Sequence, residues 1–367
     1  MRIDVITLHA IKNYGSVLQA FATQEIFKKY GYDVRIINYV REDAREENIV
    51  DTWAGGNILK RVIIWPTVLR WRQVFGSFLR KNLNISPVVY TTDSDFKEYP
   101  LDADAYCTGS DQVWNSVWNK GIIKPLYLSF VPDDMFKFAF AASFGQERLS
   151  QEEVDATKKY IDAYNFISVR EDSAKKIVEQ QYDYPNAVHV LDPTLNLTGD
   201  EWRKAAKTQK KNGNYILIYN LNRSKAFDDY AKKLSQKTGL KLVRFCTRYD
   251  QILRVGKSKL VPEVFEFVRL IDNASYVLTD SFHATAFSMN LNTEPICVYP
   301  QEFGGRIDSF LNLLESQNRH IRDYNDFDIV NRKVNFALVN SKLDAERYKT
   351  NNYLEAVFRE LNNSIDS

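Results

Sequence analysis

The chain has 367 residues, of which 44% are hydrophobic and 26% are charged, a composition typical of folded globular proteins and too apolar for a disordered one. Its 49 basic and 47 acidic side chains leave a formal net charge of +2. This near balance argues against a nucleic-acid-binding protein, because such proteins carry a large or concentrated basic excess.

The three cysteines are far apart, which argues against a disulfide framework or a Cys-rich zinc site. No spacing of His, Cys and carboxylate residues predicts a metal site, and there is no Walker loop or GxGxxG, so we expect no metal and no cofactor. The N-terminus lacks a signal peptide's apolar region, and no apolar run approaches the ~18 residues that span a bilayer. We therefore expect a cytoplasmic protein.

Short β-branched runs alternate with helical stretches along the chain. The first 40 residues predict one βαβ unit, with a strand at 2–9, a helix at 16–30 and a strand at 33–39. The next predicted elements are 103–108, 136–143, 151–164, 166–169, 172–180 and 187–191. A later series comprises 215–221, 224–238, 242–245, 262–273, 276–279, 283–289 and 295–299.

This alternation predicts an α/β fold with two Rossmann-like domains and parallel sheets. We expect an N-terminal domain over 1–200, completed by a C-terminal helix at 343–363, and a second domain over 213–330. Residues 207–213 form the best linker candidate. Ligands of such folds bind at the carboxyl ends of the strands, so we expect them in a central cleft.

The segment 59–83 departs from the alternation. It has no acidic residue, and its basic residues are Lys60, Arg61, Arg70, Arg72, Arg80 and Lys81. Aromatic and aliphatic residues interleave with these charges. One interpretation is an interfacial helix that contacts anionic lipid headgroups or a lipid-linked substrate. The other is a helix packed by its aromatic face with a solvated basic face.

Two loops at strand ends are candidate binding segments. In the first, Asn13, Gly15 and Ser16 lead into a helix whose free N–H groups can bind anions or sugar hydroxyls; the alternative is an ordinary βα loop. The second loop follows a buried strand, suits carbohydrate recognition, and contains Gly109, Ser110, Asp111 and Gln112, with Trp114 close behind. Its alternative is a capped helix start with Trp114 in the core.

Two further strand ends carry titratable groups. Arg170 can grip a carboxylate or phosphate in bidentate fashion, or form a salt bridge with Glu171 or Asp172. His283 lies at a helix start beside Asp280 and Ser281, where an imidazole is suited to proton transfer near pH 7.

These segments together resemble the polysaccharide pyruvyl transferase family. The matching motifs, in family order, are 13–20, 109–115, 168–171, 191–194 with Trp202, 280–283, and more loosely 305–307 with 310–311. The most specific of them reads Gly-Ser-Asp-Gln-Val-Trp-Asn. The resemblance implies two Rossmann-like domains arranged as in a GT-B glycosyltransferase.

The resemblance also implies a reaction, the transfer of a pyruvyl group from phosphoenolpyruvate to a sugar of a surface polysaccharide precursor, giving a cyclic ketal. The acceptor would be a carbohydrate, and one form of this hypothesis has that carbohydrate linked to a lipid. His283 matches the family's functional histidine and is the expected catalytic residue, and we expect Arg170, Ser281 and Arg306 to bind the anionic donor. Characterised members tend to carry arginine two residues before the histidine, where this chain has Ser281.

Two alternatives stay open at this point. A GT-B glycosyltransferase using a nucleotide sugar would have the same architecture. A non-catalytic carbohydrate-binding or assembly subunit would need no catalytic residues. The sequence gives no indication of the oligomeric state.

Overall fold

The computed structural model describes residues 1–211, 213–222, 224–298 and 304–366. Contacts within the chain divide it into two compact units. Unit 1 comprises Met1–Asn48, Leu79–Asn196 and Glu346–Ser367, and unit 2 comprises Ile49–Phe78 and Leu197–Ala345. Each unit is described by itself below.

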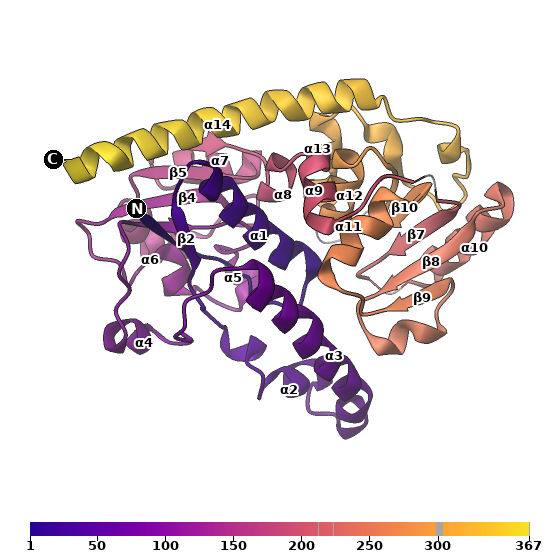
Figure 1. The fold of residues 1–367 in the computed structure, drawn as a ribbon, viewed down its shortest axis with the longest axis horizontal. Coiled ribbons are helices and arrows are strands. Elements are labelled where there is room, and N and C mark those ends of the chain that lie inside the picture. Colours follow the sequence, from indigo (N-terminus) through magenta and orange to yellow (C-terminus); the bar gives the residue numbers. More distant parts are fainter. Residues whose placement is uncertain (212, 223, 299–303, 367) are drawn as a thin grey trace. The chain divides into compact units, whose positions relative to one another are not determined.

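Unit 1 is built on a parallel sheet with the strand order β2-β1-β3-β4-β5-β6. Figure 1 labels β2, β4 and β5 of this sheet. Its strands are β1 (Arg2–Ile6), β2 (Asp33–Ile36), β3 (Ala105–Thr108), β4 (Phe136–Ala142), β5 (Phe166–Val169) and β6 (Val188–His189). β3 and β4 are buried along their whole length. That burial explains why both read in the sequence as continuous apolar runs, as strands covered on both faces do.

The helices of unit 1 connect these strands. They are α1 (Tyr14–Lys29), α4 (Asp93–Glu98), α5 (Ser116–Asn119), α6 (Gln151–Ile161), α7 (Asp172–Gln180) and α8 (Pro193–Asn196), with 3-10 turns at Glu42–Ala44 and Lys124–Tyr127. Helix α14 (Phe336–Asp366) belongs to unit 1 from Glu346 onward. There Phe358 packs its ring on Phe27 and Tyr32, at centroid distances of 5.5 and 4.5 Å.

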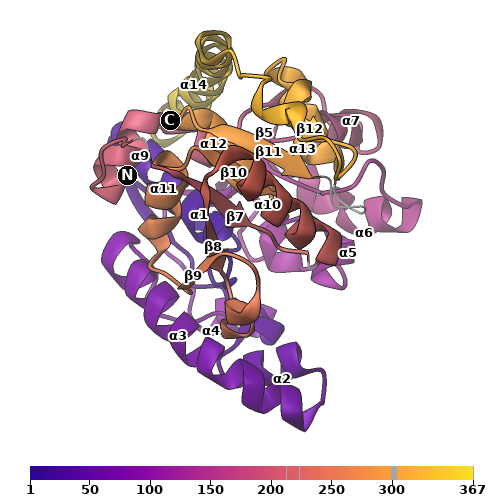
Figure 2. The ribbon, with the colours of Figure 1, turned by 90° about the vertical axis from the view of Figure 1, so that its right-hand side faces the viewer.

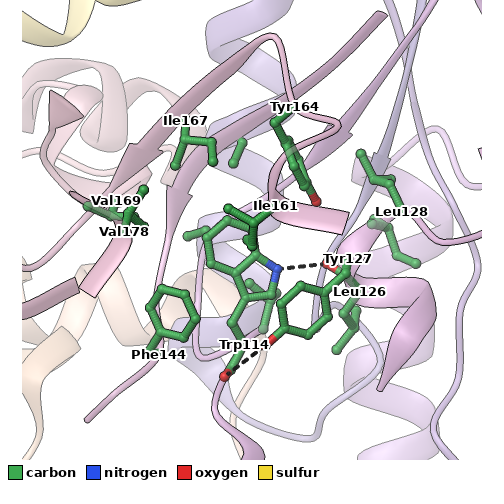
Figure 3. Packing of buried hydrophobic residues seen from close by; sticks show 14 of the residues in the cluster. Trp114, Leu126, Tyr127, Leu128, Phe144, Ile161, Tyr164, Ile167, Val169 and Val178 are labelled. Carbon is green, nitrogen blue, oxygen red and sulfur yellow. Dashed lines mark hydrogen bonds between the residues drawn. The ribbon is translucent and has the colours of Figure 1, made fainter. Parts of the chain in front are cut away.

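Trp114 lies at the centre of the core of unit 1. Its ring stacks on Tyr127 and contacts Phe144, while its indole Nε1 donates to the carbonyl of Leu126 at 3.0 Å (Figure 3). The side chain is buried. Of the two interpretations of this residue, the structure supports the one that places Trp114 in the core.

Unit 2 has a second parallel sheet, with the order β12-β11-β10-β7-β8-β9. Its strands are β7 (Tyr215–Tyr219), β8 (Lys241–Cys246), β9 (Lys257–Leu260), β10 (Tyr276–Thr279), β11 (Glu294–Val298) and β12 (His320–Ile321). The prediction of two α/β domains with parallel sheets is confirmed. The predicted strand end at Tyr299 and the linker residue Asn212 lie outside the described residues.

The helices of unit 2 include a segment from the first quarter of the chain. They are α2 (Ile49–Ala54), α9 (Gly199–Ala206), α10 (Lys225–Thr238), α11 (Val264–Asp272), α12 (Phe282–Asn290) and α13 (Gly304–Leu313), with 3-10 turns at Tyr249–Leu253, Gln317–Arg319 and Asp328–Val330. Helix α3 (Ile58–Asn82) belongs to unit 2 up to Phe78. The domain bounds predicted from the sequence place this segment in the first domain. It lies in unit 2 because the aromatic side chains of α3 pack there, as with Phe78 on Phe265.

Two general properties of the chain follow from burial and hydropathy. All three cysteines, Cys107, Cys246 and Cys297, are buried free thiols. Within residues 1–211, 213–222, 224–298 and 304–366, no helix combines the length and the apolar character needed to cross a bilayer.

His9, just after β1, makes the stability of unit 1 depend on pH. Its ring is buried, with Nδ1 3.3 Å from the carbonyl oxygen of Thr7 and Nε2 3.4 Å from Oδ1 of Asn38. Burial lowers the pKa of His9 from 6.5 to about 4. As the pH falls from 6.5 to about 4, His9 takes up a proton in the unfolded chain but not in the folded chain, so the free energy of unfolding decreases.

Between pH 7 and pH 5 we expect His9 to remove about 2 kcal/mol from the free energy of unfolding. Urea denaturation of the wild type and of His9→Gln at both pH values checks this. The variant should lose less stability on acidification than the wild type does. An equal loss in both proteins would contradict the assignment to His9.

Candidate functional site

The residues predicted from the sequence form two clusters, one in each unit. Each cluster lies at the carboxyl edge of a parallel sheet, where the loops of such folds bind ligands. Unit 1 holds Asn13, Gly15, Ser16, Gly109, Ser110, Asp111, Gln112 and Arg170. Unit 2 holds Ser281, His283 and Arg306.

The start of α1 is fixed by its cap. The side-chain oxygen of Asn13 accepts hydrogen bonds from the backbone N–H groups of Gly15 (2.8 Å) and Ser16 (3.4 Å), which is the usual role of an N-cap. The hydroxyl of Ser16 donates to Oδ2 of Asp111 at 2.5 Å. The first two predicted loops therefore meet, although 95 residues separate these two side chains.

The loop after β3 is tightly held. A Cβ atom at Gly109 would lie 3.1 Å from the side chains of both Thr7 and Val5, so a larger residue would require these neighbours to move by a few tenths of an ångström. Asp111 has a φ of 77°, a left-handed conformation that costs free energy for a residue with a side chain. Gln112 accepts a hydrogen bond from the amide of Asn115.

Arg170 is the centre of this cluster. Its guanidinium donates to Asp192 Oδ2 (2.8 Å), Glu171 Oε1 (3.1 Å) and Asp111 Oδ1 (3.3 Å), with 1% of its side chain exposed. Burial works to lower the pKa of Arg170, but the surrounding carboxylates raise it well above its ordinary value. The cluster thus has three carboxylates around one guanidinium.

This arrangement bears on the role of Arg170. The sequence predicts that Arg170 binds the donor, with a salt bridge to Glu171 or Asp172 as the alternative. The structure shows the salt bridge, and a donor anion would have to displace a carboxylate to reach the guanidinium. An excess of carboxylates repels anions but accepts hydrogen bonds from hydroxyl groups. The cluster therefore suits a sugar better than a phosphate.

Three members of the unit 1 cluster were not predicted as site residues: Glu171, Asp192 and Ser143. The hydroxyl of Ser143 donates to Glu171 Oε1 at 2.8 Å. Asp192 accepts two hydrogen bonds from Thr194, at its backbone N–H (2.9 Å) and its hydroxyl (2.7 Å). The Asp192-Pro193 step was a visible signal, because it marked a sharp break directly after a predicted strand.

In unit 2, Asp280 fixes the loop beside His283. Its carboxylate accepts hydrogen bonds from the backbone N–H groups of Leu221 (2.7 Å) and Asn222 (2.8 Å). Burial raises the pKa of Asp280 above its ordinary value, although these two N–H groups oppose the shift. Asp280 therefore ties the end of β10 to the end of β7.

The residues of α12 and α13 that were predicted to bind the donor lie together. Ser281 is the N-cap of α12, with its hydroxyl oxygen 3.4 Å from the N–H of Ala284. His283 follows in the first turn, its ring 5.5 Å from that of Phe282. The guanidinium carbon of Arg306, in α13, lies 5.9 Å from the centre of the Phe282 ring. A cation, an imidazole and a helix N-terminus thus share one region.

A second polar network of unit 2 was missed from the sequence. Arg244 donates to Asp228 at 2.6 Å and to Asn220 at 3.3 Å, and Arg254 donates to the same oxygen of Asn220 at 2.9 Å. Burial lowers the pKa of Arg244. Arg244 lies in the predicted strand 242–245, and nothing in the sequence indicates that it pairs with Asp228 of the preceding helix.

No group of three or more His, Cys, Asp or Glu side chains is arranged to hold a metal ion in the part of the chain that the structure describes. A sequence model of the polysaccharide pyruvyl transferase family matches residues 13–302, well over half of the chain. The chain belongs to this family. It is accordingly a transferase.

The residues of both clusters lie inside the matched region of this pyruvyl transferase family member, except for Arg306, which follows that region. A search of curated protein sequences finds no match.

Among solved structures, the chain is similar to a putative UDP-N-acetylglucosamine 2-epimerase from Listeria monocytogenes, with 9% sequence identity and a TM-score of 0.54. The similarity covers 96% of this chain and 94% of that one, and it shows a shared fold of two Rossmann-like domains. The glycosyltransferase SnogD from Streptomyces nogalater has a TM-score of 0.48, 8% identity and 99% coverage of both chains.

Proposed function

We propose that this enzyme transfers a pyruvyl group from phosphoenolpyruvate to a sugar of a surface polysaccharide precursor and closes a cyclic ketal. The observation that carries the proposal is the placement of His283 in the first turn of α12, with Arg306 at the neighbouring Phe282. We place the reaction in the cytoplasm, since three buried free cysteines suit a reducing compartment.

The donor defines what unit 2 must supply. Phosphoenolpyruvate carries a carboxylate and a phosphate, and both are favoured by an arginine and by the N–H groups of a helix N-terminus. Its methylene carbon must gain a proton before the adjacent carbon can be attacked. In our proposal the imidazolium of His283 donates that proton, and Arg306 with the start of α12 holds the anionic groups.

The proton balance of the reaction is complete without a co-reactant. The proton from His283 converts the methylene into a methyl group and leaves a cationic carbon, which one acceptor hydroxyl attacks. That hydroxyl loses its proton, phosphate departs with the carbon–oxygen bond electrons, and a second hydroxyl closes the ring. Of the two hydroxyl protons, one restores His283 and the other leaves with phosphate.

The carboxylate-rich cluster of unit 1 is the proposed acceptor region. Carboxylates and hydroxyls such as those of Asp111 and Ser16 accept and donate hydrogen bonds in the way that vicinal sugar hydroxyls require. A carboxylate is also the group that accepts a hydroxyl proton during attack. In this assignment Gln112 and the start of α1 contact the sugar, while the fully buried Ser110, whose hydroxyl donates to Asp192 at 3.4 Å, and Arg170 hold the carboxylates in position.

The direct test compares phosphoenolpyruvate with several nucleotide sugars as ligands of the full-length protein. A ligand that binds only the folded state raises the melting temperature. We expect a rise with phosphoenolpyruvate and, with a suitable sugar acceptor, release of inorganic phosphate. Stabilisation by a nucleotide sugar alone would overturn the proposal and indicate a glycosyltransferase. Stabilisation by neither would also overturn the proposal.

Ser281 offers a second test, because an arginine there adds a cation beside His283. For Ser281→Arg we expect phosphoenolpyruvate to bind about ten- to a hundredfold more tightly, as a charge-assisted contact would give. Calorimetric titration at fixed salt measures this. Ser281→Ala is the matched control, since it also removes the N-cap of α12 but adds no charge. Equal affinity in both variants would contradict a donor at this position.

A further inference from the structure

Helix α3 has apolar side chains on two opposite faces. One face packs into unit 2, where Val68, Trp71 and Phe75 are buried. The indole Nε1 of Trp71 donates to the carbonyl of Thr247 at 2.9 Å, and the hydroxyl of Thr67 accepts from the N–H of Tyr249 at 3.0 Å. This buried face anchors α3 to unit 2. It accounts for about half of the apolar residues of α3.

The other face of α3 is exposed. Ile58, Val62, Trp65 and Leu69 follow each other at spacings of four, three and four residues, which places them on one stripe of a helix. Relative exposures of 75% for Ile58, 68% for Val62 and 56% for Trp65 show that the stripe faces outward. Single exposed apolar residues are common on protein surfaces, whereas a continuous stripe of them marks an interaction surface.

The same region continues beyond the stripe. Leu59 and Ile63 in α3, and Trp53 in the preceding helix α2, are also exposed. Figure 2 shows that α2 and α3 directly follow one another. We call the exposed side of these two helices, from Trp53 to Leu69, the α2–α3 face.

Positive charge borders the α2–α3 face. Lys60, Arg61 and Arg72 are exposed, and the whole of α3 contains no acidic residue. Asp51 of α2 pairs with Arg61 at 3.0 Å through side chains that are both more than half exposed. Such an exposed pair is weak, so the face keeps a basic character.

We propose that the α2–α3 face docks on an anionic lipid surface. Apolar and tryptophan side chains on one stripe with cations at its border are what a helix needs to lie in the headgroup region of a bilayer. A second copy of this chain fits less well, since a two-fold interface would bring the same cations against each other. The docking would hold the enzyme at the membrane surface.

Cosedimentation with vesicles tests this proposal on the full-length protein. Vesicles of phosphatidylcholine alone are compared with vesicles that also contain phosphatidylglycerol. We expect binding only to the anionic vesicles, weakened by salt. The double variant Val62→Ser/Trp65→Ser and the double variant Lys60→Glu/Arg72→Glu should each bind at least tenfold more weakly.

Matched controls distinguish binding through this surface from nonspecific hydrophobic adsorption and from nonspecific electrostatic attraction. Tyr348→Ser removes an equally exposed aromatic side chain from α14, and Lys232→Glu/Lys233→Glu reverses two exposed charges in α10. Both should bind vesicles as the wild type does. Absence of wild-type binding, or equal loss in the controls, would overturn the proposal.

A further outcome would also overturn it, namely concentration-dependent dimerisation that Val62→Ser/Trp65→Ser abolishes in the absence of lipid. The proposal does not depend on the identity of the donor. Turnover of a soluble acceptor should be unchanged in Val62→Ser/Trp65→Ser. Failure of the docking proposal is therefore distinguishable from failure of the proposed pyruvyl transfer.

Discussion

His283→Ala should lower the rate of pyruvyl transfer by ~10²–10⁴-fold, the usual effect of removing a general acid. The residue lies in the first turn of α12 and is only partly buried, so we expect the melting temperature to change little. Single-turnover release of phosphate from phosphoenolpyruvate measures the loss. His283→Gln should be equally slow, because an amide keeps hydrogen bonding but donates no proton to carbon.

His320→Gln is the matched control for this prediction. It removes another partly buried imidazole of unit 2, one whose pKa is lowered to about 4 chiefly by burial. A ring that is neutral near pH 7 cannot serve as the acid, so this variant should keep its transfer rate. Full activity of His283→Ala would remove His283 from the mechanism and leave the proton donor unassigned.

Much of the fold could be predicted from the sequence because several of its central strands are buried along their whole length. β10, for example, is a continuous apolar run at Tyr276–Thr279, and the turn after it places His283 at a helix start. Strand β9 (Lys257–Leu260) was not predicted because lysines occupy alternate positions in it and because it lies at an edge of the sheet. Edge strands carry such charges to avoid pairing with other chains.

The partners of Arg170 could not be predicted, for a different reason. Asp111 and Asp192 lie 59 and 22 residues away from it in sequence, and only the order of β3, β4, β5 and β6 in the sheet brings their loops together. Periodicity detects which residues are buried along one element. It carries no information about which loops meet at the edge of a sheet.

Helix α3 illustrates a similar limit. Its apolar residues cover both faces, so the sequence pattern alone could not separate a packed aromatic face from an exposed one. The tertiary contacts of Trp71 and Phe78 make that distinction. The site residues predicted from motifs lie in loops that follow strands, while their hydrogen-bond partners are contacts that only the structure shows.

Arg170→Ala should destabilise unit 1 by about 3–5 kcal/mol, the cost of leaving buried charges without their partner. Asp111, Glu171 and Asp192 would then repel each other without the guanidinium that lies between their charges. Urea denaturation of the variant and of the wild type at pH 7 measures the difference.

Arg2→Ala is the matched control, because it breaks an exposed ion pair with Asp33 in the same unit; it should cost under about 1 kcal/mol.

Arg170→Lys separates the two roles considered for Arg170. A lysine cannot reproduce the planar fork that reaches three carboxylates. If Arg170 organises the acceptor region, this variant should raise the KM of the sugar while phosphoenolpyruvate binds as before; weaker phosphoenolpyruvate binding with an unchanged sugar KM would restore the donor-binding role.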